Sequence, residues 1–181
     1  MIVLFMANGT EEIEALTPVD LLRRAGIEVR IVGVGGRRVI GSHGVHIECD
    51  IADAEWECPA HLEGVVLPGG MPGTKHLDAS PVVDRTLSTA SSQGRLMAAI
   101  CAAPLILGRR GLLDGFRATC FPGFEGELTG ARVESSPVCR DGNIITARGA
   151  GAALPFALEL VSALCGEERA KALAGEIQCS V

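Results

Sequence analysis

The sequence contains few aromatic and few basic residues. Aromatic residues make up 3% of the 181 positions and tyrosine is absent, so we expect a core built from aliphatic side chains. The 16 lysines and arginines are outnumbered by 22 acidic residues, which gives a net charge of -6. Such a chain has no basic stripe able to neutralise several phosphates, so we expect no nucleic-acid partner.

Long apolar runs are also missing. No uninterrupted apolar stretch approaches the length of about 18 residues that a membrane-spanning helix requires. The apolar start, residues 1–6, lacks the basic residues of a secretory signal and ends at Ala7-Asn8-Gly9, so we interpret it as a first strand. We therefore expect no association with a membrane.

The cysteines show none of the regular spacing of a disulfide framework. Their number is odd, and they stand at Cys49, Cys58, Cys101, Cys120, Cys139, Cys165 and Cys179. A chain of this length buries roughly 70% of its unfolded surface and folds without such cross-links. We expect a reducing, cytoplasmic location and a single domain over residues 1–181.

Short apolar segments alternate with segments of helical character along the chain. The expected strands are 2–6, 29–34, 65–67, 96–100 and 144–147, and the expected helices are 11–25, 81–93, 102–110 and 151–165. Several strands are continuously apolar, as parallel strands covered on both faces are. Asp141-Gly142 is typical of a hairpin turn and adds one antiparallel strand. The pattern predicts an α/β fold with a mostly parallel central sheet, helices on both faces and a small β-hairpin excursion.

Cys101 stands between an expected strand and an expected helix. It follows the apolar segment 96–100 and precedes Ala102-Ala103-Pro104, where proline suits the first turn of a helix. The free N–H groups and the dipole of a helix N-terminus favour a thiolate, so we expect a lowered pKa and a nucleophilic, oxidisable sulfur at Cys101. The alternative is an inert buried cysteine, the commoner fate of a cysteine in an apolar run, and the spacing alone leaves both open.

Glu14 lies near the start of the first expected helix, on a column that is otherwise apolar. The residues four, seven and eleven positions further on are Pro18, Leu21 and Ala25. Glu14 is therefore expected to point inward, where burial raises the pKa of its carboxyl and the helix N-terminus lowers it. We interpret Glu11 and Glu12 as first-turn acids that complement the helix dipole.

Two glycines follow the strand expected at 65–67. In a mostly parallel sheet, ligands bind beyond the carboxyl ends of the strands. Gly69 and Gly70 allow close approach of a ligand to the backbone, and the N–H groups of Gly70 and Ala102 are candidates for an anion pocket that holds an oxyanion or a cysteine sulfinate. Taken alone, two glycines after a strand are more often a simple turn.

A competing cluster has the residue types of a zinc site. It contains His43, His46 and Cys49, followed by Cys58 and His61. Side chains three positions apart on a strand point to opposite faces of the sheet, so His46 cannot share one metal ion with both His43 and Cys49. We therefore expect no bound metal.

Six segments resemble, in order, the ThiJ/PfpI superfamily. They are 7–14, 18–20, 23–26, 65–70, 98–104 and 148–151, and the closest branch is that of the Parkinson-associated protein deglycase and its bacterial relatives. The resemblance implies a flavodoxin-like three-layer sandwich, a homodimer and a nucleophilic Cys101 whose sulfur receives a hydrogen bond from a protonated Glu14. The pair would hold one proton between them, because two adjacent anions repel each other.

The same resemblance implies two functions for one site. The first is a cofactor-independent glyoxalase or protein deglycase, in which Cys101 adds to methylglyoxal, or to its early adducts on amines and thiols, and Glu14 moves protons. The second is a redox-sensing stress-response protein or chaperone whose Cys101 is oxidised to sulfinate.

The chain departs from the pattern of its relatives near the expected site. Phe121 stands where human-type members carry a histidine, and Ala150 and Ala152 replace a more usual proline and threonine. A mechanism that needs a histidine at position 121 is therefore in doubt. Ala102 occupies the position at which the protease-like branch has a histidine after its nucleophile, which argues against amidohydrolase or peptidase activity of the PfpI type.

Overall fold

The computed structural model describes residues 1–179, which fold around one main β-sheet. Within those residues the sheet has seven strands in the order β10, β11, β7, β6, β1, β2, β5. Their bounds are β1 Ile2–Met6, β2 Val29–Gly33, β5 Ile51–Ala52, β6 Gly64–Leu67, β7 Leu96–Ile100, β10 Val138–Asp141 and β11 Ile144–Ala147. All neighbouring strands are parallel except β10, which pairs antiparallel with β11.

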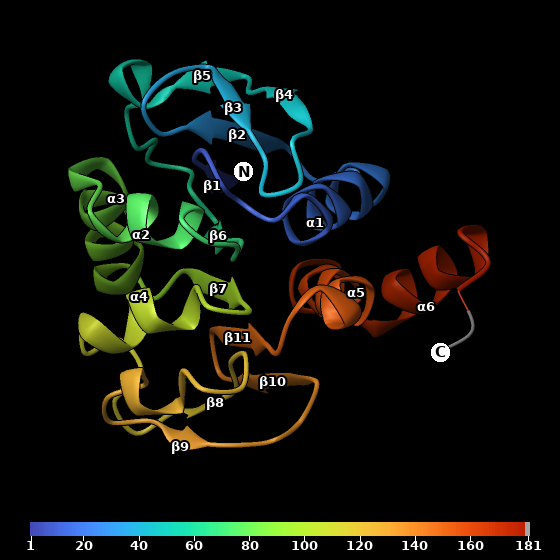
Figure 1. Ribbon diagram of the computed structural model, residues 1–181. Coiled ribbons are helices and arrows are strands. Elements are labelled where there is room, and N and C mark those ends of the chain that lie inside the picture. Colours follow the sequence, from blue (N-terminus) through green and yellow to red (C-terminus); the bar gives the residue numbers. More distant parts are fainter. Residues whose placement is uncertain (180–181) are drawn as a thin grey trace.

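Helices cover both faces of this sheet, as Figure 1 shows. They are α1 Glu12–Arg24, α2 Gly73–Asp78, α3 Pro81–Ser92, α4 Pro104–Arg109, α5 Ala153–Cys165 and α6 Glu167–Glu176, together with the 3₁₀ turns η1 Asp53–Glu55, η2 Glu125–Glu127 and η3 Ala150–Ala152. Helices α1, α5 and α6 lie against one face, and α2, α3 and α4 lie against the other. The fold is a flavodoxin-like α/β sandwich.

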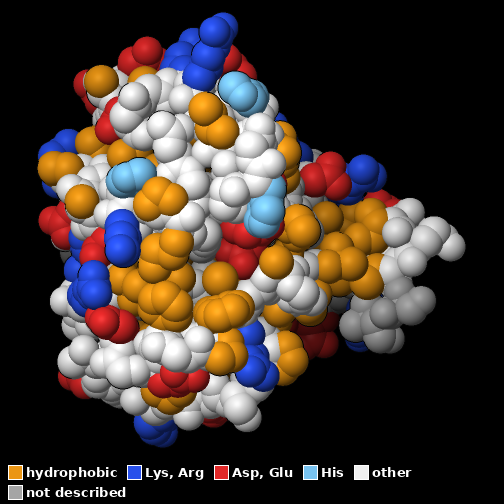
Figure 2. All heavy atoms as spheres, in the orientation of Figure 1, with side chains coloured by type: hydrophobic (Ala, Val, Ile, Leu, Met, Phe, Trp, Pro, Cys, Tyr) orange, Lys and Arg blue, Asp and Glu red, His pale blue; other side chains and the backbone are white. Residues whose placement is uncertain are grey.

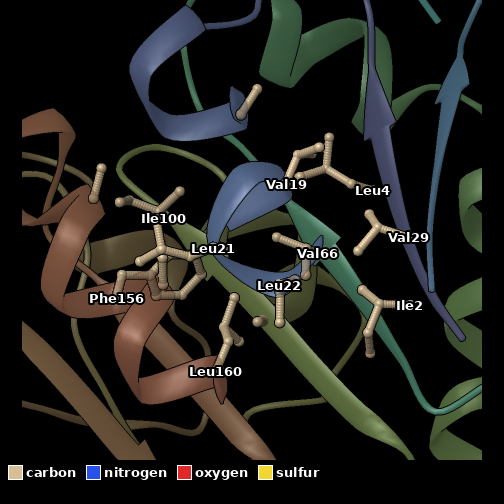
Figure 3. Packing of buried hydrophobic residues seen from close by; sticks show 14 of the residues in the cluster. Ile2, Leu4, Val19, Leu21, Leu22, Val29, Val66, Ile100, Phe156 and Leu160 are labelled. Carbon is tan, nitrogen blue, oxygen red and sulfur yellow. The ribbon is translucent and has the colours of Figure 1, made fainter. Parts of the chain in front are cut away.

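Alternation of side chains along the strands divides the core in two. Ile2, Leu4 and Ile100 point toward α1 and α5, where they pack with Leu22 and Phe156 (Figure 3). The intervening strand residues form a second cluster with α2, α3 and α4. Strands buried on both faces must be apolar throughout, which explains the continuous runs in the sequence.

Local sequence signals account for several helix ends. The Glu11 side chain caps α1 by accepting a hydrogen bond from the N–H of Glu14, and Ser80 caps α3 in the same way through Val83. Helix α1 stops at Ala25, and Gly26 then adopts a positive φ of 85° that glycine reaches without strain.

Two small sheets lie beside the main one. β3 Arg38–Ile40 pairs antiparallel with β4 His46–Glu48, and β8 Arg117–Ala118 pairs with β9 Arg132–Val133. The segment 41–45 joins β3 to β4 and is hydrogen-bonded to the side chain of Glu12 at the start of α1. Within the part of the chain that is described, no helix combines the length and apolar character that spanning a bilayer would demand.

The expected fold class is confirmed, with corrections to its elements. The strands at 2–6, 96–100 and 144–147 and the hairpin through Gly142 are found as predicted. The helix expected at 102–110 is shorter, because a turn occupies Ala102 and Ala103 before Pro104. The helix expected from 151 begins at Ala153, after η3. That residues 1–181 form a single domain remains a prediction.

Candidate active site

Three loops meet at the carboxyl edge of the sheet. They follow β1, β6 and β7, which are consecutive neighbours in the sheet. The chain leaves β1 for β2 on one side, whereas β6 pairs with the other side of β1. Such a reversal of strand order opens a crevice in which α/β proteins commonly bind ligands. The structure brings Glu14, Gly69, Gly70, Cys101 and Ala102 together at this place.

Cys101 occupies a strained turn between β7 and α4. Its φ of 65° lies in the left-handed region, which costs a non-glycine residue on the order of 1–3 kcal/mol. The backbone is held on both sides, since its N–H donates to the Ala147 carbonyl at 2.8 Å and its carbonyl accepts from the Phe121 N–H at 2.8 Å. The half-buried thiol is thus presented from a fixed backbone, and the tight strand-to-helix turn expected from the sequence is present.

Glu14 points into the protein beneath this turn. The residue is 1% exposed, and its Oε2 accepts a hydrogen bond from the Gly69 N–H at 2.9 Å. The Cys101 thiol donates a second hydrogen bond to the same carboxyl group. The inward orientation predicted from the apolar column is therefore found, and the buried partner of Glu14 is the cysteine.

The two groups strongly influence each other's ionisation. Burial, together with the nearby charge of Glu11, raises the pKa of the Glu14 carboxyl to about 7, against the hydrogen bonds from Cys101 and Gly69. Burial first, and Glu14 second, raise the pKa of the Cys101 thiol to about 12. Between these values the pair carries one negative charge and shares one proton, because two adjacent anions in a buried site would repel each other.

The expectation of a lowered pKa for Cys101 is wrong. The backbone N–H groups of Ala102 and Gly70 donate to the sulfur and lower its pKa, as the predicted anion pocket requires, but burial and the charge of Glu14 outweigh them. The helix that follows, α4, has only six residues and starts three positions beyond the cysteine. Burial raises the pKa of the Glu14 carboxyl to about 7, which is the direction that the protonated glutamic acid implied by the resemblance requires.

Glycine is required where the β6 loop meets the other two loops. A Cβ at Gly69 would lie 2.6 Å from Glu14 Oε2 and 2.7 Å from Cys101 Cβ. Gly70 has a φ of 88°, and a Cβ there would lie 2.3 Å from the Glu11 nitrogen. Both glycines therefore permit the close approach that brings the carboxyl and the thiol together.

Glu12 has a structural role that sequence reasoning missed. It is 8% exposed, and its carboxylate accepts hydrogen bonds from Ser42 Oγ at 3.2 Å and from the His43 N–H at 2.8 Å, with His43 Nδ1 at 3.0 Å. Burial alone would raise the pKa of Glu12, but the hydrogen bonds from His43, first among them, and from the backbone of Glu12 and Val45 lower it to about 2. Leu16 and Val19 lie four and seven positions further along α1, but Arg23 lies eleven positions further on, so the apolar column that identified Glu14 is only partly present for Glu12.

One group of side chains has the spacing of metal ligands. Oxygen and nitrogen atoms of Glu11, Glu12 and His43 lie within 4.8 Å of one another. This group differs from the histidine and cysteine cluster considered from the sequence. Glu12 already holds the segment 41–45, and Glu11 caps α1, so their oxygens are engaged in hydrogen bonds within the fold.

A groove on the surface lies elsewhere. A groove of about 570 Å³ runs between β10, α5 and α6, lined among others by Arg140, Leu158 and Lys171. None of the five residues of the predicted site lines it.

This arrangement defines the class of the protein: a flavodoxin-like α/β protein with a cysteine in a strained turn at the carboxyl edge of its sheet. The DJ-1/PfpI family model matches residues 1–163, and the chain belongs to that family, as its sequence motifs predicted.

Known relatives match nearly the whole chain. Protein dj-1beta of Drosophila melanogaster is 38% identical over 172 residues, covering 93% of this chain and 91% of the relative. A relative in Caenorhabditis elegans, named glutathione-independent glyoxalase DJR-1.2, is 31% identical over 174 residues and covers 95% and 92%. The solved structure titled "Toxoplasma gondii DJ-1, oxidized" superposes with a TM-score of 0.90 at 33% identity and covers 99% and 98%.

Proposed function

We propose that the protein is a cofactor-independent glyoxalase that converts methylglyoxal, free or as an early adduct on amines and thiols, into a hydroxyacid. The observation that carries the proposal is the buried pair of Cys101 and Glu14, which shares one proton beside two backbone N–H donors. A nucleophile next to a base with a pKa of about 7 suits proton transfer at neutral pH. The glyoxalase named among the relatives supports the same reaction.

The reaction follows from the charges of the pair. Glu14 carboxylate takes the thiol proton as Cys101 Sγ bonds to the aldehyde carbon of methylglyoxal, and then gives that proton to the new alkoxide. The product of this step is a hemithioacetal. The N–H groups of Gly70 and Ala102 are proposed to stabilise negative charge as it develops.

Proton transfer then completes an internal oxidation and reduction. Glu14 removes the hydrogen on the former aldehyde carbon and returns it to the neighbouring carbon, while the hydroxyl proton passes between the two oxygens. The first carbon is oxidised by two electrons to a thioester, and the ketone carbon is reduced by the same two electrons to an alcohol. Water then cleaves the thioester, which releases lactate and restores the thiol, so no external oxidant or reductant is consumed.

The test is turnover of methylglyoxal without glutathione, with the product identified as lactate. Cys101→Ala and Glu14→Gln should each lower kcat/KM by at least about 100-fold, because each removes one partner of the nucleophile and base pair. Cys139→Ala removes another buried thiol, on β10, and serves as the matched control. Lactate formation by Cys101→Ala at the wild-type rate would contradict the proposal.

A redox-sensing stress-response role, with or without chaperone activity, is the second candidate. The observation in its favour is the pair of backbone N–H groups at Gly70 and Ala102, which suit the oxygens of a sulfinate on Cys101. The test is mild peroxide treatment followed by peptide mass spectrometry. Selective gain of two oxygens at Cys101, without measurable turnover of methylglyoxal, would favour the sensor. Oxidation spread evenly over the cysteines would argue against it.

We also propose that the protein forms a homodimer. Large apolar side chains of α1 and of the segment 41–45 beside it are exposed to solvent. Their exposed fractions are 55% at Ile13, 38% at Leu16 and 48% at Val45. Figure 2 shows hydrophobic side chains gathered over the middle of one face, next to acidic side chains. Sedimentation should give twice the mass of one chain, and Leu16→Arg should give the mass of one. A wild-type chain that sediments as a monomer would refute this.

A further inference from the structure

Within residues 1–179, several large apolar side chains are exposed to solvent, and among them only Phe121 is aromatic. Its side chain is 47% exposed, whereas the rings of Phe5 and Phe156 are fully buried. An exposed phenyl ring in a chain with only 3% aromatic residues is not needed for the core. Its position relative to the candidate site therefore decides what the ring does.

The backbone ties Phe121 to the reactive cysteine. The Phe121 N–H donates to the Cys101 carbonyl at 2.8 Å, and the Phe121 carbonyl accepts from the Phe124 N–H at 3.1 Å. These two hydrogen bonds fix the turn that carries the ring. The backbone that carries the ring therefore has a set position beside the turn of Cys101.

Gly149 shows that the ring and the acid border the same space. A Cβ placed on Gly149 would lie 3.2 Å and 3.7 Å from two ring carbons of Phe121 and 3.9 Å from Glu14 Oε1. One small group at this point would thus touch both the phenyl ring and the carboxyl group. Gly149 therefore places no side chain between the ring and the carboxyl group.

We propose that Phe121 forms an apolar wall for the carbon substituent of the substrate, and selects 2-oxoaldehydes with an aromatic or bulky apolar substituent over methylglyoxal. This inference rests on the proposed glyoxalase function. The ring cannot exchange protons, so it adds no acid or base to the site. It offers a stacking surface, and an aromatic pair gains about 0.5–1.5 kcal/mol beyond the apolar area it buries, which corresponds to a preference of roughly two- to twelvefold.

The experiment compares kcat/KM for phenylglyoxal and for methylglyoxal in one protein at a time. Phe121→Leu should lower the ratio of the two values roughly two- to twelvefold, chiefly through a higher KM for phenylglyoxal, because the stacking surface is lost. Phe121→Tyr keeps a ring and should restore the ratio.

Phe116→Leu is the matched control. The Phe116 ring also lies against a glycine, since a Cβ placed on Gly142 would lie 3.5 Å from a ring carbon. Gly142 belongs to the turn between β10 and β11, at the end of β11 opposite to the one that contacts Cys101. Its substrate ratio should equal that of the wild type. An unchanged ratio in Phe121→Leu, or an equal fall in Phe116→Leu, overturns the inference while leaving the glyoxalase intact. A wild-type protein that turns over neither aldehyde overturns both proposals.

Discussion

Replacing Gly69 by alanine tests whether the spacing between acid and thiol governs reactivity. The added Cβ would lie 2.6 Å from Glu14 Oε2, 2.7 Å from Cys101 Cβ and 2.9 Å from the Ile100 carbonyl oxygen. Glu14 can turn its carboxyl aside, but Cys101 Cβ and the carbonyl belong to a turn that is hydrogen-bonded on both sides. The carboxyl must therefore leave the thiol, or the β6 loop must move away from β7.

The expected magnitudes follow from the overlap. Overpacking of this kind costs about 1–3 kcal/mol in the free energy of unfolding, and a misplacement of about 1 Å in a reacting group lowers the rate roughly 100-fold. Urea unfolding measures the first quantity, and lactate formation from methylglyoxal measures the second. The pKa of the Glu14 carboxyl should also change, because its hydrogen bonds to Gly69 and Cys101 are disturbed.

Gly175→Ala provides the control for this substitution. Gly175 is exposed on α6, and a Cβ added there meets nothing within 4 Å. That variant should keep wild-type activity and gain up to about 1 kcal/mol, since alanine favours a helix. Wild-type activity and wild-type stability in Gly69→Ala would refute the view that close packing of Glu14 against Cys101 matters.

Three further predictions concern the acidic residues. The pKa of Glu14 in the folded protein, about 7, exceeds the ordinary value of 4.5, so its carboxyl contributes about 3 kcal/mol to the free energy of unfolding; this contribution is fully present below pH 4.5 and is lost as the pH rises through 7. Urea unfolding of Glu14→Gln should lack this pH dependence. If the variant keeps the pH dependence, other groups cause it. The kcat/KM for methylglyoxal should rise with pH to a plateau above about 7, as the pair loses its first proton; a rate that climbs steadily to pH 10 would point to the isolated thiol instead. Glu12→Gln should lower the free energy of unfolding by roughly 1–3 kcal/mol at pH 7 and speed amide exchange in residues 41–45, because the charge-assisted hydrogen bonds from His43 and Ser42 are weakened. Glu48 is exposed on β4, and Glu48→Gln is the control, which should change neither the stability nor the exchange rates.

The central part of the fold could be predicted because its strands carry unambiguous signals. The strands at 2–6 and 96–100 are continuous apolar runs that end at turn residues, and the structure keeps their predicted bounds. β5 has two residues and α2 has six, which is too short for a periodic pattern to identify them. α6 was missed as well, although its buried positions Ala170, Leu173 and Ala174 follow a helical spacing.

That Glu14 and Cys101 lie together at the strand ends could be predicted from the sequence, whereas their ionisation could not. Glu14 stood out because its neighbours on one helix face are apolar, and Cys101 because it ends an apolar strand before a proline. Their pKa values depend on how deeply three separate loops bury the pair, which no local pattern records. The role of Glu12 likewise depends on a segment about 30 residues further along the chain.

The backbone of Cys101 links its strained turn to the sheet. Its N–H donates a hydrogen bond to the last residue of β11, and its carbonyl accepts one from the segment after β8. The residue therefore cannot leave its left-handed conformation until both hydrogen bonds break. Local fluctuations of the α4 turn therefore leave the sulfur in place. Strand pairing therefore preorganises the turn of Cys101, which is released only when the sheet itself opens.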